Sequence, residues 1–457
     1  MDYIENKTFE EIQVGDSASL VRILAPQDVK LFAALPGDVD AAYVDQEYVR
    51  SAHGMWGGAL ISTVLGTKLP GPGATCLGQS LRFLKPVAPG ETVTATVTVA
   101  GKDPEKHQVT FDCGCTNEKG EEVISGSAQV IAPTQKIKRP RATLPEAHLD
   151  DHGVRFRQLI DLTKGLTPAR TAIVHPVDGN SLRGALDAAQ ANLVIPLLVG
   201  PEAKIRAAAA AEELDLSPYE LVPTRDSQEA ATTAVALARA GKVEVLMKGS
   251  LHTDELMREV VARDTGLGTG RRMSHVFAVD APAYPRPLFL TDAAINISPD
   301  LEDKRDIVQN AIDLTHALGI ENPRVAILSA VETVTPKLRS TLDAAALCKM
   351  ADRGQITGGV VDGPLAFDNA VSEEAARVKG IVSPVAGRAD IFVVPDLESG
   401  NMLIKQLEYL ADARAAGIVL GARVPIALTS RADKPSSRMA SCAIALLLTR
   451  QRRSVVA

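Results

Sequence analysis

The stretch that decides the fold lies near the C-terminus, at residues 417–433, and reads GIVLGARVPIALTSRAD. Its first ten residues are mostly apolar, which is typical of a buried parallel strand that ends in a polar turn. In open α/β sheets, ligands bind at the C-terminal ends of such strands. Ser430, Arg431 and Asp433 place a hydroxyl, a guanidinium and a carboxylate there, a set suited to orienting an oxyanion and handling a proton. The alternative is that Ser430 caps a helix beside a surface Arg–Asp pair.

The sequence from about residue 153 onward alternates short apolar runs with amphipathic helical segments. Clear apolar runs occur at residues 193–200, 243–247, 324–329 and 389–395. This alternation predicts an α/β region whose mostly parallel sheet is covered by helices on both faces.

Polar clusters follow the predicted strands at seven places. Because the C-terminal ends of parallel strands meet at one edge of a sheet, we expect these clusters to form one cleft. In the first cluster, Lys248 and Ser250 form either a phosphate-cradling turn or a strand-to-helix cap. Asn401 either lines the cleft or pairs on a helix face. The seven clusters are residues 248–253, 271–275, 291–296, 329–332, 362–369, 395–401 and 429–433.

The N-terminal part of the chain has a different texture. A segment rich in proline and basic residues, 133–152, predicts an exposed linker. Before it, residues 54–69 have the pattern of a helix, and four β-like segments follow. We therefore expect a first domain over 1–132 and a second over 153–457. The predicted strands are residues 78–86, 91–103, 106–117 and 121–132.

Composition excludes several classes of protein. A chain of 457 residues is too long for one ordinary core, so two or three domains are expected. A net charge of -7 argues against a nucleic-acid-binding surface, and five cysteines suggest reduced thiols and a cytoplasmic location. The acidic start does not resemble a signal peptide, and no apolar run has membrane-spanning length. There is no Walker A loop, no HExxH and no paired CxxC, so we predict no metal site and no cofactor.

In their order, the motifs of residues 155–455 resemble those of the phosphate acyltransferases, the phosphate acetyl- and butyryltransferase family. They look more like the butyryltransferase branch. The resemblance implies acyl transfer between CoA and inorganic phosphate without a metal or redox cofactor. It also implies two α/β subdomains similar to isocitrate- and isopropylmalate-dehydrogenase folds, the second inserted at about 276–427. The motifs are VLMKGSLHT, RRMSH, FLTDAAIN, GPLAFDNA, SPVAGRAD, PDLESGN and TSRAD.

The resemblance also implies roles for individual residues. Ser430 and Arg431 match the pair that stabilises the transition state and binds phosphate. Arg258 matches a second phosphate-binding arginine if one residue is skipped in the alignment. The aspartate that serves as thiol base in the acetyltransferases is replaced by Ser437, and Asp433 is the nearest substitute.

Residues 8–132 resemble the MaoC-like hot-dog family, in which an antiparallel sheet wraps one long helix and dimers bind acyl-CoA. The (R)-specific enoyl-CoA hydratases of that family activate water with an Asp and a His. Here Asp38 matches the Asp, but Tyr43 stands at the His position. A tyrosine with an ordinary pKa of ~10 is a poor base at neutral pH. His53, at the helix entry, is either structural or a substitute base.

These observations predict a phosphate acyltransferase with an N-terminal α+β hot-dog domain that handles acyl-CoA. One alternative is a bifunctional enzyme whose N-terminal domain also hydrates enoyl-CoA. Another is a regulatory protein that senses acyl-CoA. The expected partners are acyl-CoA, CoA and phosphate, together with further copies of the chain in a homodimer or larger assembly.

Overall fold

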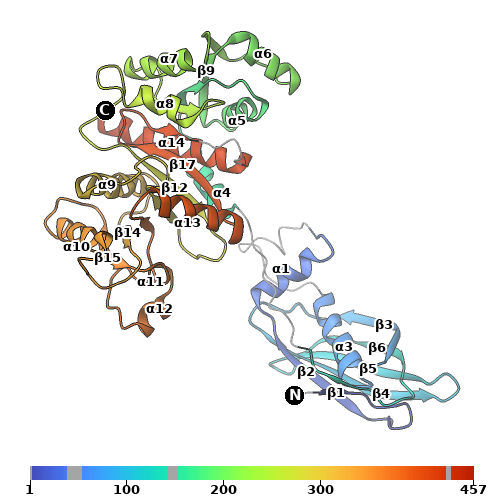
Figure 1. Cartoon of the computed structure of the whole chain (residues 1–457). Coiled ribbons are helices and arrows are strands. Elements are labelled where there is room, and N and C mark those ends of the chain that lie inside the picture. The colour runs from blue at the N-terminus through green and yellow to red at the C-terminus, as the bar shows by residue number, and fades with distance from the viewer. Residues whose placement is uncertain (1–2, 39–53, 143–152, 429–433, 457) are drawn as a thin grey trace. The chain divides into compact units, whose positions relative to one another are not determined.

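The computed structural model describes residues 3–38, 54–142, 153–428 and 434–456. The chain forms two compact units, Met1–Asp150 and Asp151–Ala457 (Figure 1).

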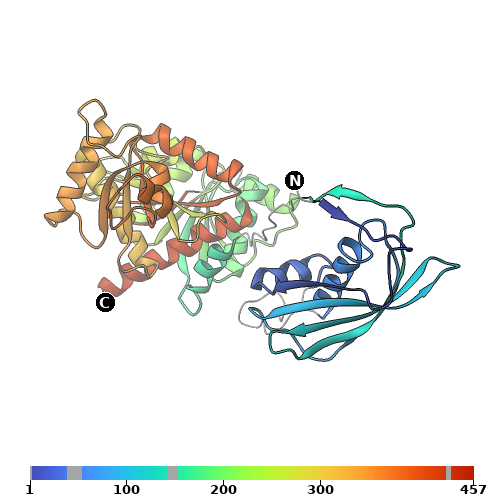
Figure 2. The same cartoon turned by 90° about the horizontal axis from the view of Figure 1, so that it is seen from below.

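The first unit contains a five-stranded antiparallel sheet in the order β2-β4-β5-β6-β3 (Figure 2). Along β4, buried and partly exposed residues alternate, as expected when one face of a strand covers a core. Its strands are β2 Ser17–Ile23, β3 Thr75–Phe83, β4 Thr92–Asp103, β5 Gln108–Asn117 and β6 Glu122–Ile131.

Helix α3 (Met55–Thr67) packs its buried side chains against this sheet, and the shorter α1 (Pro26–Ala34) precedes it. Trp56, Ile61 and Val64 share one apolar core with residues of β4, β5 and β6. An antiparallel sheet around one long helix is the arrangement that the hot-dog resemblance implies, and it makes this unit α+β.

Part of the predicted linker is a strand instead. β7 (Lys138–Pro140) pairs antiparallel with β1 (Tyr3–Glu5). The side chain of Asn6 supports the pair by donating to the Gln135 carbonyl at 2.8 Å and accepting from the Ile137 N–H at 2.8 Å. The exposed, basic β7 has no apolar pattern, so only its distant partner reveals it as a strand. Residues 143–152 of the linker lie outside the described residues.

The second unit is an α/β structure built on an eleven-stranded sheet, in the order β10-β9-β8-β11-β18-β17-β12-β13-β16-β14-β15. Its strands are β8 Ala169–Val174, β9 Val194–Gly200, β10 Glu220–Pro223, β11 Val245–Lys248, β12 Ser274–Asp280, β13 Leu288–Thr291, β14 Arg324–Leu328, β15 Val360–Leu365, β16 Ile391–Val393, β17 Arg414–Leu420 and β18 Ile426–Ala427. Its helices are α4 Val154–Asp161, α5 Gly179–Gln190, α6 Glu202–Ala211, α7 Ser227–Arg239, α8 Thr253–Val260, α9 Leu301–Ala317, α10 Arg339–Asp352, α11 Phe367–Val371, α12 Glu373–Val378, α13 Leu397–Leu410 and α14 Pro435–Val456.

The sheet consists of two parallel blocks. Strands β10, β9, β8, β11 and β18 form one block, and β13, β16, β14 and β15 form the other. The pairings β18–β17, β17–β12 and β12–β13 are all antiparallel, so the two blocks run in opposite directions. The C-terminal ends of their strands therefore lie at opposite edges of the sheet, where an edge is the line formed by the ends of the strands. The edge at the C-terminal ends of β13, β16, β14 and β15 is called the second edge below.

The prediction of one parallel strand over residues 417–426 was wrong. Residues up to Leu420 belong to β17, which is antiparallel to both neighbours, and only the short β18 runs parallel to β11. Gly421 makes the reversal possible because its φ of +82° lies in the left-handed region. A side chain there would also collide with the Arg272 carbonyl of the adjacent segment.

Helix α14 completes the core of this unit. Its residues Ala440 to Leu448 are nearly all buried, and they pack with residues of β8, β11 and β17 in one apolar cluster. The last helix of the chain therefore contacts some of the first strands of the unit.

Candidate functional site

The C-terminal ends of β11 and β18 lie side by side. Met247 is in register with Ala427, which puts Lys248 next to Leu428. Ser430, Arg431 and Asp433 follow immediately but lie outside the described residues, and the chain is described again from Lys434. Leu428, the last described residue before that segment, therefore lies beside the turn that follows Lys248.

That turn, residues 248–250, is held tightly by the backbone. The N–H groups of Gly249 and Ser250 donate to the carbonyls of Val174 and His175, each at 2.9 Å. Lys248 is only 6% exposed, and its Nζ donates to two carbonyls of its own turn at 3.1 and 3.2 Å. A buried cation thus lies at the C-terminal end of β11, as a site for anions requires.

An acidic and a basic group flank the same turn. Asp178 caps α5 by accepting from the Ser181 N–H at 2.8 Å. Burial raises the pKa of Asp178, but hydrogen bonds from Ser250 and Ser181 and the charge of Arg438 outweigh it, so the pKa is lowered. Arg438, in the first turns of α14, is buried and donates to the Asn180 carbonyl at 2.6 Å.

Sequence reasoning missed both Asp178 and Arg438. The available signal was an Asp-Gly-Asn-Ser cap after the apolar run of β8, which read as an ordinary helix start. Arg438 was hidden in a helix whose first turn has no distinctive pattern.

Two histidines of this unit, His175 and His275, are buried, and burial disfavours the charged form of their rings. Burial lowers the pKa of His175, whose Nδ1 lies 3.3 Å from the Ser250 carbonyl oxygen. Burial also lowers the pKa of His275 to about 3, and its ring packs edge-on against Phe277. A neutral, fully buried imidazole acts as a core side chain.

Two further predicted site residues, Arg258 and Asn401, have exposed side chains. Arg258 is in the last turn of α8, where its side chain is 65% exposed and 3.8 Å from Asp254. Asn401 is exposed on α13 and donates weakly to the Ala293 carbonyl at 3.4 Å. Because α13 follows β16, Asn401 belongs to the opposite edge of the sheet from Lys248.

The expectation that all seven polar clusters form one cleft was therefore wrong. It assumed that the strands preceding the clusters all run in one direction. The three antiparallel pairings in the middle of the sheet send the clusters after β13, β14, β15 and β16 to the opposite edge from those after β11 and β18.

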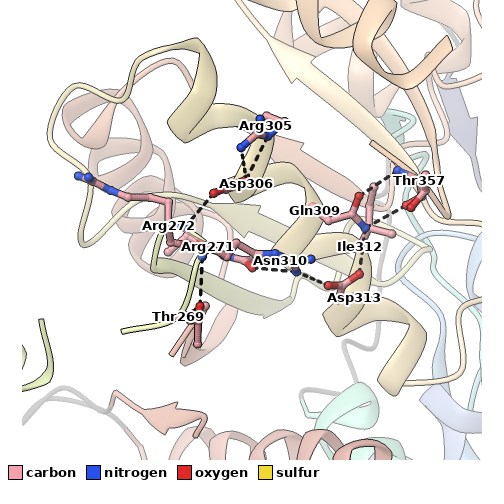
Figure 3. Close-up of polar contacts among 12 residues, drawn as sticks. Thr269, Arg271, Arg272, Arg305, Asp306, Gln309, Asn310, Ile312, Asp313 and Thr357 are labelled. Atoms are coloured by element: carbon pink, nitrogen blue, oxygen red, sulfur yellow. Dashed lines mark hydrogen bonds and ion pairs between the residues drawn. The ribbon is translucent and has the colours of Figure 1, made fainter. Parts of the chain in front are cut away.

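Several of the clusters do meet at this second edge. Cluster 291–296 contacts both 271–275 and 395–401, and Asn369 of 362–369 donates to Glu332 of 329–332. Figure 3 shows the contacts of Arg271 and Arg272 with α9. The Nε of Arg272 donates to Asn296 Oδ1 at 2.7 Å, and its backbone N–H donates to Asp306 Oδ2 at 2.8 Å. The neighbouring Arg271 forms an ion pair with Asp313 of α9.

In the first unit, Tyr43 and His53 lie outside the described residues. Asp38 is half-buried, and its N–H donates to the Ala33 carbonyl at 2.9 Å. A cavity of about 270 Å³ lies beside the start of α3. Its lining is largely apolar and includes Trp56, Phe83 and Val87, with Lys85 among the few polar residues.

Among residues 3–38, 54–142, 153–428 and 434–456, no three His, Cys, Asp or Glu side chains gather as a metal would need. The same described residues include no helix with the length and apolar character required to span a membrane.

Comparison with known proteins identifies the second unit. A family described as "Phosphate acetyl/butaryl transferase" matches residues 225–446. A phosphate acetyltransferase of Rhizobium meliloti is 63% identical over 300 residues, which is 66% of this chain and 95% of that protein. The structure of a branched-chain phosphotransacylase from Enterococcus faecalis V583 is 30% identical, covers 61% of this chain and 99% of its own, and has a TM-score of 0.54.

The N-terminal third has its own similarity. The R-hydratase PhaJ1 from Pseudomonas aeruginosa is 36% identical and covers 32% of this chain and 99% of its own, with a TM-score of 0.32. The extent and identity of the match to the Rhizobium enzyme show that this chain belongs to the phosphate acetyl/butyryltransferase family of acyltransferases.

Proposed function

We propose that the protein transfers a short acyl group between CoA and inorganic phosphate, with acetyl as the first candidate and butyryl as the alternative. The observation that carries the proposal is the register of β11 and β18. By this register Leu428, two residues before Ser430, lies beside the buried Lys248 and a turn that is hydrogen-bonded to Asp178. The 63% identity to a phosphate acetyltransferase favours acetyl.

In this mechanism Arg431 holds phosphate through its planar guanidinium, assisted by the cations of Lys248 and Arg258. A phosphate oxygen attacks the thioester carbonyl carbon, and Ser430 donates a hydrogen bond to the oxyanion that forms. The carbon–sulfur bond then breaks, and CoA leaves as a thiolate. In the reverse direction Asp433 takes the thiol proton, sulfur attacks the acyl phosphate, and phosphate leaves.

The substrates supply all the reacting groups, so we propose that no metal or other cofactor takes part. Release of CoA from acetyl-CoA should require phosphate and should continue at an unchanged rate in excess chelator. The thiol is measured by a colorimetric reagent, with propionyl- and butyryl-CoA run in parallel. Loss of activity on chelation, restored by a divalent ion, would contradict this proposal. Absence of phosphate-dependent release with all three esters would instead favour the acyl-CoA-sensing alternative.

We also propose that the N-terminal unit binds acyl-CoA without efficient hydration. The apolar cavity beside α3 supports acyl binding, and Tyr43 in place of histidine supports weak hydration. Exposed apolar residues on and after β3, among them Leu77, Phe83 and Leu84, support contact with another copy of the chain.

Replacing Tyr43 by histidine should therefore raise hydration of crotonyl-CoA. A positioned acid–base group contributes ~10²–10⁴-fold, and the variant should recover part of that range. Absorbance of the enoyl thioester measures the reaction. The matched control is Tyr43→Phe, which removes the hydroxyl without adding a base and should not raise the rate. Fast hydration by the unmodified protein, abolished by Asp38→Asn, would show that Tyr43 is no handicap.

For the domain arrangement we propose a first domain of 1–132 that β7 extends to Pro140, a linker in the remainder of 133–152, and a second domain of 153–457 with an inserted subdomain at about 276–427. The second parallel block, β13 to β16, falls within that insertion, which supports the similarity to isocitrate-dehydrogenase-like folds. We also propose a cytoplasmic location, which the five unpaired cysteines support.

A further inference from the structure

A cavity of about 550 Å³ lies at the second edge of the sheet, where none of the proposed catalytic residues is found. The turn after β17 and the last turns of α14 form part of its lining. Leu420, Ala422 and Leu448 contribute apolar surface, and Gln451 and Arg452 contribute polar groups. This volume is in the range of sites for small molecules, ~300–1,000 Å³.

The cavity is remote from the reaction loop along the chain. The 429–433 segment precedes the start of α14 at Pro435, whereas Arg452 is near the other end of that helix. At a rise of 1.5 Å per residue, Pro435 and Arg452 are separated by roughly 25 Å along α14. A group bound beside Arg452 is therefore not the group that reacts at the 429–433 segment.

On its other side the cavity meets the cluster drawn in Figure 3. Asn310 and Asp313 point from α9 toward the loop that carries Arg271. Arg271 is paired with Asp313, whose second oxygen accepts from Gln309 at 2.9 Å. The carboxylate is thus already neutralised and satisfied by protein groups. Thr269, which donates to the Gly421 carbonyl at 2.6 Å, completes this side.

Among the described residues, no carboxylate pairs with Arg452, the second arginine of the cavity. Its guanidinium donates to the carbonyls of Ala422 (3.2 Å) and Arg423. These contacts occupy two of the five N–H donors of an arginine. Burial lowers the pKa of Arg452, because a cation loses water there. With one ion pair and one further arginine, the lining has a net positive charge.

We propose that this cavity binds a phosphate ester of mononucleotide size. The remaining donors of Arg452 suit a phosphate group, because a guanidinium fork matches its oxygens. The apolar side chains of Leu420, Ala422 and Leu448 suit a body that is flat and largely apolar. Such a body is a nucleobase, whether from a free nucleotide or from the adenosine end of CoA.

The test is calorimetric titration of AMP into the full chain in phosphate-free buffer. We expect saturable binding of one AMP per chain, weakened about tenfold or more by Arg452→Gln, because a charged hydrogen-bonding partner is lost. The matched control is Arg450→Gln, an exposed arginine two positions earlier on the same helix, which should leave the affinity unchanged. Gln451→Glu keeps the carbonyl contacts of Arg452 and should also weaken binding, through repulsion.

Three results would overturn the proposal. They are no saturable binding up to about 10 mM AMP, an equal loss in Arg450→Gln, or a loss in Arg431→Gln, which would place AMP at the reaction site. A parallel CoA titration identifies the source of the ligand. If CoA occupies a second site that Arg452→Gln abolishes and Arg450→Gln does not, the ligand of the cavity is CoA itself. If AMP binds but no second CoA site is found, the ligand is a free nucleotide. Acyl transfer without AMP should be unchanged in Arg452→Gln, so this test is separate from that of the proposed activity.

Discussion

Replacing Arg431 by glutamine should lower phosphate-dependent release of CoA ~10²–10³-fold, the loss typical when a group that stabilises transition-state charge is removed. Glutamine keeps part of the length of the side chain but loses the charge and the planar fork. The measurement is the initial rate as a function of phosphate concentration at saturating acetyl-CoA. Arg431→Lys keeps the charge alone, and its rate should fall between those of Arg431→Gln and the unmodified protein. Its saturation by phosphate should change more than its saturation by acetyl-CoA.

The matched control for this prediction is Arg423→Gln. Arg423 lies in the turn between β17 and β18, its side chain is exposed, and its backbone N–H, which the substitution retains, donates to the Leu267 carbonyl at 2.9 Å. Its rate should match that of the unmodified protein. If Arg431→Gln also keeps its rate and its phosphate saturation, Arg431 is not part of the phosphate site.

The substitution Gly249→Ala should be the most damaging small change near the site. An added methyl carbon would lie 2.5 Å from the Val174 carbonyl oxygen and 2.9 Å from the carbonyl carbon of His175. Both are backbone atoms of the neighbouring segment, so the turn itself must move. We expect a loss of about 1–3 kcal/mol in the free energy of unfolding. A shift of about 1 Å in the turn should also lower the rate ~10²-fold.

Chemical denaturation and the CoA-release assay measure the two effects. Gly270→Ala is the control, because a methyl group there meets nothing within 4 Å and the residue is not in the left-handed region. Equal behaviour of the two variants in both measurements would show that the 248–250 turn has room to relax and does not position the reaction.

Much of the fold could be predicted from local patterns. Alternation of apolar and polar residues located β4, and the apolar runs located β9, β11 and β14 to within a few residues. Elements without such a pattern were missed. β2 is mostly exposed along its length, and β7 is a short basic strand whose only support is pairing with β1.

Strand direction could not be predicted from the sequence, because it depends on which distant segments pair. Residues 417–426 have the composition of one buried strand, yet Gly421 reverses the chain within them. That reversal introduces the β17–β18 pair, one of the three antiparallel pairs at the centre of the sheet. Together the three pairs separate Asn401 from Lys248, although the residue types at both places fit one site equally well.

The candidate site was predictable only where its residues lie in a recognisable local sequence. Lys248 and Ser250 follow an apolar run and carry a motif, so both chemistry and resemblance indicated them. Asp178 belongs to the site through its hydrogen bond with Ser250, and Arg438 through its charge beside Asp178, although both are distant from Ser250 in the chain. Their local sequences are those of ordinary helix starts, and such sequences do not reveal that the two side chains lie close together in the fold.

The position of β18 and α14 has a consequence for how the protein is made. β11 leaves the ribosome early, but its neighbour β18 emerges only after residues 249–425 have been synthesised, and α14 comes last of all. Until then one side of β11 is an unpaired edge, and the apolar surface that α14 covers is open to other nascent chains. Pairing across so long a separation is slow. Ribosome-bound chains that end before Ile426 should therefore be the species that chaperones bind and that aggregate when translation stalls.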